Sequence, residues 1–152
     1  MYYKIQIKIC IYQKKTLSLY HNRKERSLEM KNRSFFKKWN NKVMEDWGCV
    51  VSADFNKFQN AFKREMANIA TEIGGTLVSY NKGHYDMSGF IKKGDKFAYF
   101  SFSNFGYRSC ANLTNRGTIY VRTAENERDF RGGTNHNISY LELIETLKKI
   151  LK

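Results

Sequence analysis

The sequence predicts a single α+β domain in two layers, an antiparallel sheet of three to five strands covered by two helices, with a basic N-terminal extension. Three observations predict this fold. Residues 53–73 carry a helical apolar stripe, residues 76–123 alternate with period 2 between short turns, and residues 139–151 return to helical spacing. Strands joined by short turns pair antiparallel. We place the extension at residues 1–34 and the α+β domain at residues 35–152.

The extension has two parts by pattern. Residues 2–12 alternate apolar and polar side chains, which predicts a half-buried strand. Residues 13–34 lose this alternation and concentrate charge, which indicates a mobile or weakly helical tether. Met30 also opens a plausible protein start, so residues 1–29 can alternatively be read as an upstream extension with little structural role.

Two helices are expected before the sheet. The first, over residues 34–48, is short and amphipathic, and five apolar residues share its face: Phe35, Phe36, Trp39, Val43 and Trp47. The second is the clearest helix of the chain, because its apolar residues recur every three or four positions: Phe55, Phe58, Phe62, Met66, Ile69 and Ile73. Ser52 or Asp54 can cap its start, and Gly74–Gly75 ends it.

The remaining elements follow the same patterns. Four strands are expected, over residues 76–80, 84–92, 96–103 and 118–123, and tight turns at 81–83 and 93–95 separate the first three. A polar loop then precedes the last helix, whose start carries a capping box between Ser139 and Glu142.

Charge is concentrated at one end of the chain. Residues 1–42 contain twelve Lys or Arg and two Glu, a net of +10, while residues 43–152 contain fifteen basic and twelve acidic residues, a net of +3. A basic segment attracts polyanions whatever its fold, so we expect a nucleic acid or nucleoprotein partner. The residues expected to bind it are Lys14, Lys15, Arg23, Lys24, Arg26, Lys31, Arg33, Lys37, Lys38, Arg122, Arg128 and Arg131.

The loop at residues 122–136 is the densest polar stretch. Gly132–Gly133 lets backbone N–H groups turn toward an anion, and Asn135 and His136 follow closely. No phosphate-binding loop of known spacing is present, since neither G-x-x-x-x-G-K-[ST] nor G-x-G-x-x-G occurs. The alternative interpretation is a structural loop, held by internal Arg–Glu and Arg–Asp pairs, that positions the last helix.

A second group of polar residues lies on the expected strand 84–92. His84, Asp86 and Ser88 would share one strand face, where they could bind a metal together with His136, or simply face solvent. The three cysteines have no paired spacing, so neither a disulfide framework nor a zinc knuckle is predicted. We expect no cofactor and no metal.

Aromatic residues cluster on and after the third strand. Tyr99 and Phe100 alternate in direction there, with Phe102, Phe105 and Tyr107 following. Alternation requires about half of them to face the core, and an exposed subset could stack on nucleic-acid bases. The sequence does not decide which subset is exposed.

Three segments resemble a family of small uncharacterised proteins encoded on phages, plasmids and integrative elements of low-G+C Gram-positive bacteria. The shared pattern is G-H-Y-x-x-S-x-F-I, a Y-F-S-x-S-D-like strand, and R-T-A-x-x-x-x-D-[YF]-x-G-G-x-N-H. It is met at Gly83, His84, Tyr85, Ser88, Phe90, Ile91, Tyr99, Phe100, Ser101, Ser103, Arg122, Thr123, Ala124, Asp129, Phe130, Gly132, Gly133, Asn135 and His136. Asn104 departs from it. The resemblance covers about residues 53–151, implies a mobile-element origin and carries no catalytic residue.

Together these features favour binding over catalysis. We expect an accessory protein of a phage or other mobile element that binds nucleic acid or a host nucleoprotein in the bacterial cytoplasm, with no membrane partner. One alternative is an inhibitor of a host defence nuclease, as anti-CRISPR proteins are. The other is a metal-dependent nuclease or hydrolase using His84, Asp86 and His136. The oligomeric state is left open.

Overall fold

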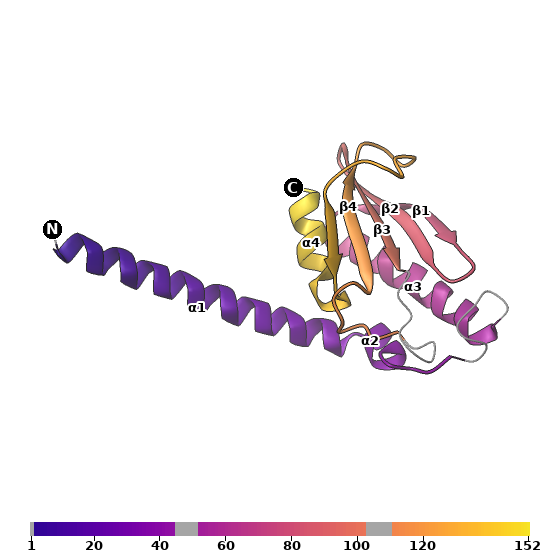
Figure 1. Cartoon of the computed structure of the whole chain (residues 1–152), viewed down its shortest axis with the longest axis horizontal. Coiled ribbons are helices and arrows are strands. Elements are labelled where there is room, and N and C mark those ends of the chain that lie inside the picture. The colour runs from indigo at the N-terminus through magenta and orange to yellow at the C-terminus, as the bar shows by residue number, and fades with distance from the viewer. Residues whose placement is uncertain (1, 45–51, 103–110) are drawn as a thin grey trace.

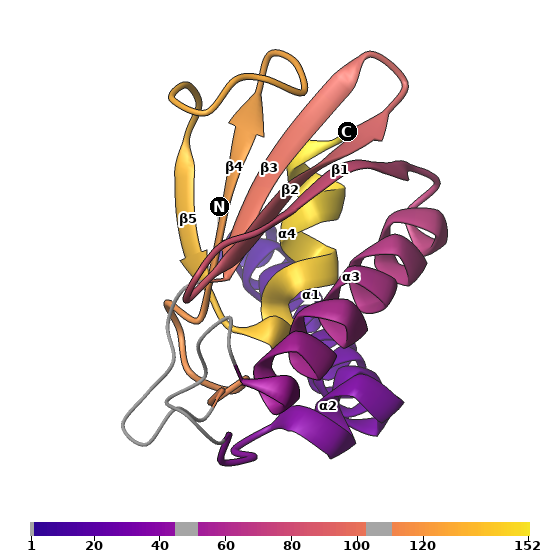
Figure 2. The same ribbon diagram turned by 90° about the vertical axis from the view of Figure 1, so that its right-hand side faces the viewer.

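The computed structural model confirms the α+β architecture, with one antiparallel five-stranded sheet and helices packed on one of its faces (Figures 1 and 2). It describes residues 2–44, 52–102 and 111–152, with side chains described from residue 16 onward. The strands lie in chain order, so each pairs with its neighbours in sequence. They are β1 (Thr76–Lys82), β2 (Met87–Lys93), β3 (Lys96–Phe102), β4 (Ile119–Ala124) and β5 (Asn135–Ile138).

Helix α3 (Ala53–Glu72) supplies the centre of the core. All six residues of its predicted apolar stripe are buried. The Ser52 side chain caps its start by accepting from the Phe55 backbone N–H at 3.2 Å. At its other end Gly74 takes φ +77°, and the Gly75 N–H donates to the Ala70 carbonyl at 2.8 Å. The predicted helix is therefore confirmed with both of its termini.

The register of the sheet separates two faces. On the helix-covered face, Phe100 and Phe102 of β3 are fully buried against α3, in edge-on contact with Phe62 at 6.0 and 5.3 Å between ring centroids. The opposite face, which we call the outer face, carries their alternating neighbours. Its residues are Ser88, Phe90, Lys92, Phe97, Tyr99, Ser101, Tyr120, Arg122, Asn135 and Asn137.

The C-terminal helix is divided in two. The predicted capping box is present, with the Glu142 carboxylate accepting from the Ser139 backbone N–H at 3.1 Å, and it begins a short 3-10 turn, η2 (Tyr140–Glu142). Helix α4 (Leu143–Ile150) continues from it and buries Leu143, Ile144 and Leu147 against the sheet.

The predicted strand at residues 2–12 is wrong. These residues belong to α1 (Tyr2–Asn32), a helix that also takes in residues 13–32 and projects away from the domain (Figure 1). The apolar residues fit both periods, since Tyr2, Ile5, Ile9 and Tyr12 are spaced by three, four and three positions. Within the described part of the chain, no helix is long and apolar enough to cross a membrane.

The helix predicted over residues 34–48 is shorter than expected. Helix α2 (Ser34–Trp39) buries Phe35 and Trp39, as its pattern predicts, but it ends at Asn40. Asn41 takes φ +58°, and its N–H donates to the Ala111 carbonyl at 2.8 Å, so the chain turns toward the loop before β4. Val43 is consequently 60% exposed, whereas Trp47 lies outside the described residues.

A buried carboxylate joins the N-terminal helices to the domain. Glu65 of α3 is 6% exposed and accepts from Arg33 Nε and from the Tyr140 hydroxyl, both at 2.5 Å. Arg33 also donates to Glu72 at 2.8 Å. Burial raises the pKa of Tyr140, and the adjacent Glu65 charge raises it further, so the hydroxyl stays a donor.

Replacing Arg33 by Ala should therefore destabilise the fold strongly. The Glu65 carboxylate would stay buried with Tyr140 as its remaining described donor, and breaking one side of a buried ion pair costs about 3–5 kcal/mol. Urea unfolding measures this loss. The matched control is Lys31→Ala, an exposed cation two positions earlier in the chain at the end of α1, which should change stability by less than about 0.5 kcal/mol. Equal stabilities for the two variants would contradict this role of Arg33.

Candidate nucleic-acid interface

Three of the predicted binding arginines are engaged in holding the fold. Arg33 pairs with Glu65 and Glu72, and Arg26 of α1 pairs with Glu145 of α4. Arg122 is 2% exposed within the sheet. These three cations are largely neutralised by contacts within the chain. Fewer of the twelve predicted binding residues are therefore available to a partner.

Five other predicted cations are exposed: Arg23, Lys24, Lys31, Lys37 and Lys38. Among the described residues none of them lies within 4.0 Å of a carboxylate oxygen. Lys38 instead lies over the ring of Trp39 at 5.3 Å. Lys14 and Lys15 lie on α1 as well, but their side chains are outside the described part.

A groove forms where α1 passes the start of η2. It has a volume of about 410 Å³ and combines residues from distant parts of the chain. We call it the α1 groove, and its lining residues are Tyr20, Arg23, Lys24, Ser27, Arg116, Ser139, Leu141 and Glu142.

The charges on the far wall of the α1 groove balance each other. Arg116 donates to Glu142 from Nη2 at 2.6 Å and from Nε at 3.2 Å, a bidentate contact. This contact and the donors of Ser139 lower the pKa of Glu142 to about 2. Because Arg116 offsets Glu142, the two cations of the near wall, Arg23 and Lys24, leave the groove with a net positive charge.

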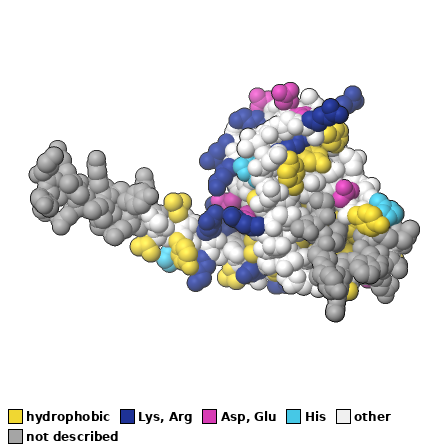
Figure 3. Space-filling view, in the orientation of Figure 1, with side chains coloured by type: hydrophobic (Ala, Val, Ile, Leu, Met, Phe, Trp, Pro, Cys, Tyr) yellow, Lys and Arg dark blue, Asp and Glu magenta, His cyan; other side chains and the backbone are white. Residues whose placement is uncertain are grey.

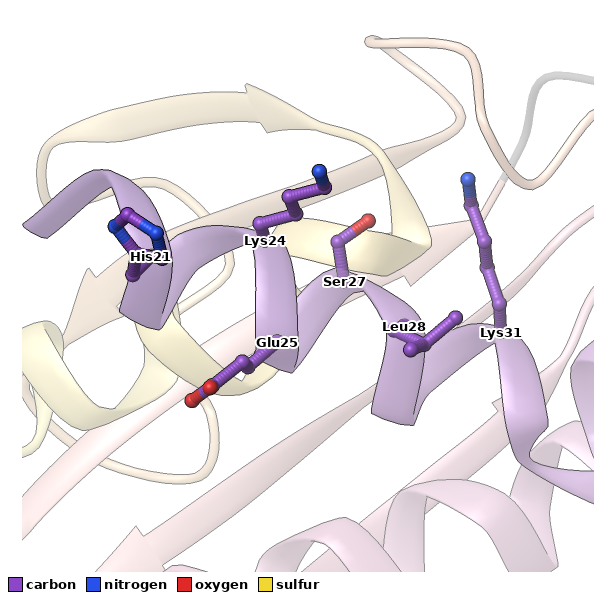
Figure 4. A pocket seen from close by; sticks show the side chains of 6 residues that line it. All are labelled: His21, Lys24, Glu25, Ser27, Leu28 and Lys31. Atoms are coloured by element: carbon purple, nitrogen blue, oxygen red, sulfur yellow. The ribbon is translucent and has the colours of Figure 1, made fainter.

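A second hollow lies on α1 itself (Figure 4). It has a volume of about 320 Å³ and is lined by His21, Lys24, Glu25, Ser27, Leu28 and Lys31. The side chains of Lys24, Ser27 and Lys31 point to the same side of the helix. Lys24 and Ser27 line both hollows, so one polar and cationic row runs along α1 from the groove toward α2.

The loop between β4 and β5 is organised around Arg122 and Asp129. The Arg122 guanidinium donates to the carbonyls of Thr123, Asp129 and Gly132 and lies 4.7 Å from the Tyr99 ring centroid. The Asp129 carboxylate accepts from the N–H groups of Gly132, Arg131 and Glu125 at 2.7, 3.1 and 3.0 Å.

The glycine pair has a structural reason. Gly133 takes φ +88°, and a Cβ there would lie 2.0 Å from the Thr123 carbonyl oxygen. At Gly132 a Cβ would lie 2.8 Å from the Asp129 carboxylate. The N–H groups of Arg131 and Gly132 are already bound to Asp129, and the buried Arg122 donates to three carbonyls, so these contacts favour the alternative of a structural loop. The expected binding role of Arg122 and the functional role of Gly132 and Gly133 stay predictions. Arg128 and Arg131 remain exposed.

The predicted histidine and aspartate positions are not brought together. Strand β2 begins at Met87, so His84 and Asp86 lie in the β1–β2 turn instead of sharing a strand face. His136 lies on β5, opposite Val121, and three strand spacings of about 4.8 Å put β5 about 14 Å from β2. The described residues contain no group of three or more His, Cys, Asp or Glu that could hold a metal ion.

Sequence reasoning missed several features of this interface. Asn135 and His136 were expected in a loop, yet they form β5, whose pairing is set by β4. The pair of Arg116 and Glu142 was missed because the two residues are 26 positions apart. Comparison of the chain with protein-family models, curated proteins and solved structures finds no match, so the resemblance to a mobile-element family stays a prediction.

The contribution of the Asp129 carboxylate to stability should decrease at acidic pH. Its three backbone donors lower its pKa to about 2, so its contribution to stability is present above its ordinary pKa and is lost as pH falls toward about 2. In Asp129→Asn, we expect a lower Tm at neutral pH and a smaller decrease of Tm between about pH 5 and about pH 2. Glu127→Gln is the matched control, because Glu127 has no hydrogen bond or ion pair among the described contacts. Identical pH profiles for wild type and Asp129→Asn would contradict the assignment.

Proposed function

We propose that this protein binds nucleic acid, with the α1 groove and the adjoining row of α1 receiving the phosphate backbone. The observation that supports this proposal best is the unbalanced charge of Arg23 and Lys24 in a groove whose other ion pair is internally matched. Phosphate groups are the polyanions that such a cationic groove attracts, and their displaced counterions supply binding free energy.

The chemistry of the groove suits a nucleic-acid strand beyond its charge. Ser27 carries a hydroxyl that can donate to phosphate oxygens. Tyr20 is 65% exposed at the same groove, where its ring can stack on a base or sugar. Lys24 and Lys31 are seven residues apart on α1, which corresponds to about 10.5 Å along the helix axis.

The biological setting belongs to the same proposal. An accessory protein of a phage or other mobile element would meet nucleic acid in the cytoplasm of its bacterial host. Naked nucleic acid and a nucleoprotein present the same phosphates to the groove. Binding that requires a protein-bound strand, such as the guide of a host defence nuclease, would distinguish an inhibitor from a direct nucleic-acid binder.

Binding should be steeply dependent on salt and should depend on the groove. For a fluorescent 15-nucleotide single strand, the slope of log affinity against log salt should become shallower by about 1.4 in Arg23→Ala/Lys24→Ala, since two phosphate contacts are removed. Fluorescence anisotropy at several salt concentrations measures both affinity and slope.

The matched control for this experiment is Lys63→Ala/Arg64→Ala. It removes the same two residue types from adjacent exposed positions of α3, and thus the same net charge, away from the groove. We expect its slope to stay close to that of the wild type. Equal effects of the two double variants would show that Arg23 and Lys24 contribute only through net charge and would contradict the role of the groove. The absence of binding at low salt would refute the proposal.

A further inference from the structure

The outer face of the sheet carries an aromatic cluster that is separate from the hydrophobic core on the helix-covered face. The Phe90 ring lies 5.1 Å from Tyr99 and 5.2 Å from Phe130, and Tyr99 lies 6.3 Å from Tyr120. These residues come from β2, β3, β4 and the β4–β5 loop. Figure 3 views the molecule from the side of β4 and shows hydrophobic side chains gathered there, with cationic side chains nearby.

The tip of this cluster is exposed and firmly held. Phe130 covers Phe90, which is fully buried, yet leaves 56% of its own surface in solvent. Its neighbour Asp129 accepts three backbone N–H groups, and Arg122 donates to the carbonyls of Asp129 and Gly132 on either side. The exposed ring is therefore presented by a loop whose conformation is held by the partly buried contacts of Arg122 and the exposed backbone contacts of Asp129.

We propose that the outer face, from Phe130 toward Tyr120, is a stacking platform for the bases of single-stranded nucleic acid. Phe130 is exposed, and Tyr99 and Tyr120 are half-buried on the outer face. Such partly open rings give unpaired bases a π-surface that a duplex cannot use, because its bases are already stacked. This inference rests on the proposed function, and it specifies that the preferred form is single-stranded.

Charge around the platform fits this ligand. Arg128 and Arg131 flank Phe130 in the sequence and are exposed, and Lys92 lies over the Phe97 ring at 5.3 Å. Glu125 and Glu127 share the loop, so the platform itself is nearly neutral. Its contribution must then come mainly from ring contact, while phosphate attraction comes from the α1 groove.

The groove and the platform lie at the two ends of one strand pair. Ser139 of the groove directly follows β5, and Asn135 at the start of β5 accepts from the Tyr120 hydroxyl on the outer face. Strand β5 contains four residues, about 14 Å at 3.4 Å per residue. A single strand can therefore pass from one to the other along Asn137 and Asn135.

The experiment compares three 15-mers, a single-stranded oligothymidylate, its duplex with oligoadenylate and an abasic strand with the same phosphates. We expect the single strand to bind tightest. Phe130→Ala should lower the affinity for the oligothymidylate at least about fivefold at every salt concentration, with an unchanged slope of log affinity against log salt. The affinity for the abasic strand should not change. Tyr85→Ala is the matched control, since Tyr85 is a 59% exposed aromatic residue on the β1–β2 turn.

Phe130→Trp serves as a second variant that keeps an aromatic ring on the loop, so that loss of the ring can be distinguished from a folding defect. It should retain affinity, and its fluorescence should be quenched by the oligothymidylate but not by the abasic strand. Equal binding of the oligothymidylate and abasic strands, without an effect of Phe130→Ala, would overturn the platform while the groove proposal stands. Displacement of the single strand by an acidic peptide, with the same sensitivity to Phe130→Ala, would also overturn it in favour of a protein partner. Failure of all three 15-mers to bind would refute the proposed function itself.

Discussion

The buried carboxylate of Glu65 is the constraint on which the arrangement of the helices depends. It lies on α3 and accepts from Arg33, which follows α1, and from Tyr140, which opens the C-terminal helical segment. A buried charge needs partners on more than one side, because an unpaired carboxylate in the core is far costlier than an exposed one. One residue of α3 thereby fixes where both the N-terminal and the C-terminal helices meet the domain. The positions of Arg23 and Lys24 opposite Ser139 follow from this junction.

Part of the arginine set is used within the fold, and other arginines are exposed. Arg26, Arg33, Arg116 and Arg122 all make ion pairs within the chain, whereas most described lysines point to solvent. The planar guanidinium suits this use, since its several donors can satisfy a carboxylate and carbonyls at once. Net charge therefore overstates the cation density available to a partner, and the location of the remaining cations matters more than their number.

The sequence correctly predicts those segments whose residue pattern fits only one type of secondary structure. The α3 stripe from Phe55 to Ile73 and the Ser139–Glu142 capping box are local, and both are confirmed. Residues 2–12 satisfy the period of a strand and that of a helix, so local pattern could not decide between them. Strand β5 has one buried apolar residue, Ile138, and is a strand because β4 offers it hydrogen bonds.

The candidate site was less predictable than the fold for a related reason. A list of basic residues can be read from the sequence, but whether an arginine faces a carboxylate depends on pairs far apart in the chain. Arg33 and Glu72 are 39 positions apart, and Arg26 and Glu145 are 119 apart. The β4–β5 loop shows the same limit, because the sequence around its Gly pair suggests an anion site, whereas in the fold the N–H groups of Arg131 and Gly132 donate to Asp129.

The rigid spacing between groove and platform has an energetic consequence. Strand β5 is hydrogen-bonded to β4 along Ile119–Arg122, so the two ends of this strand pair cannot move independently. Under the proposed function, a nucleic-acid strand bound at the α1 groove would be held near the platform at a high effective concentration, and the second contact would cost little further translational entropy. Two individually weak surfaces, one electrostatic and one aromatic, can in this way yield useful affinity. Because the electrostatic part would weaken with salt and the stacking part would not, the balance between the two proposed contacts would set how selective binding is for exposed bases at physiological ionic strength.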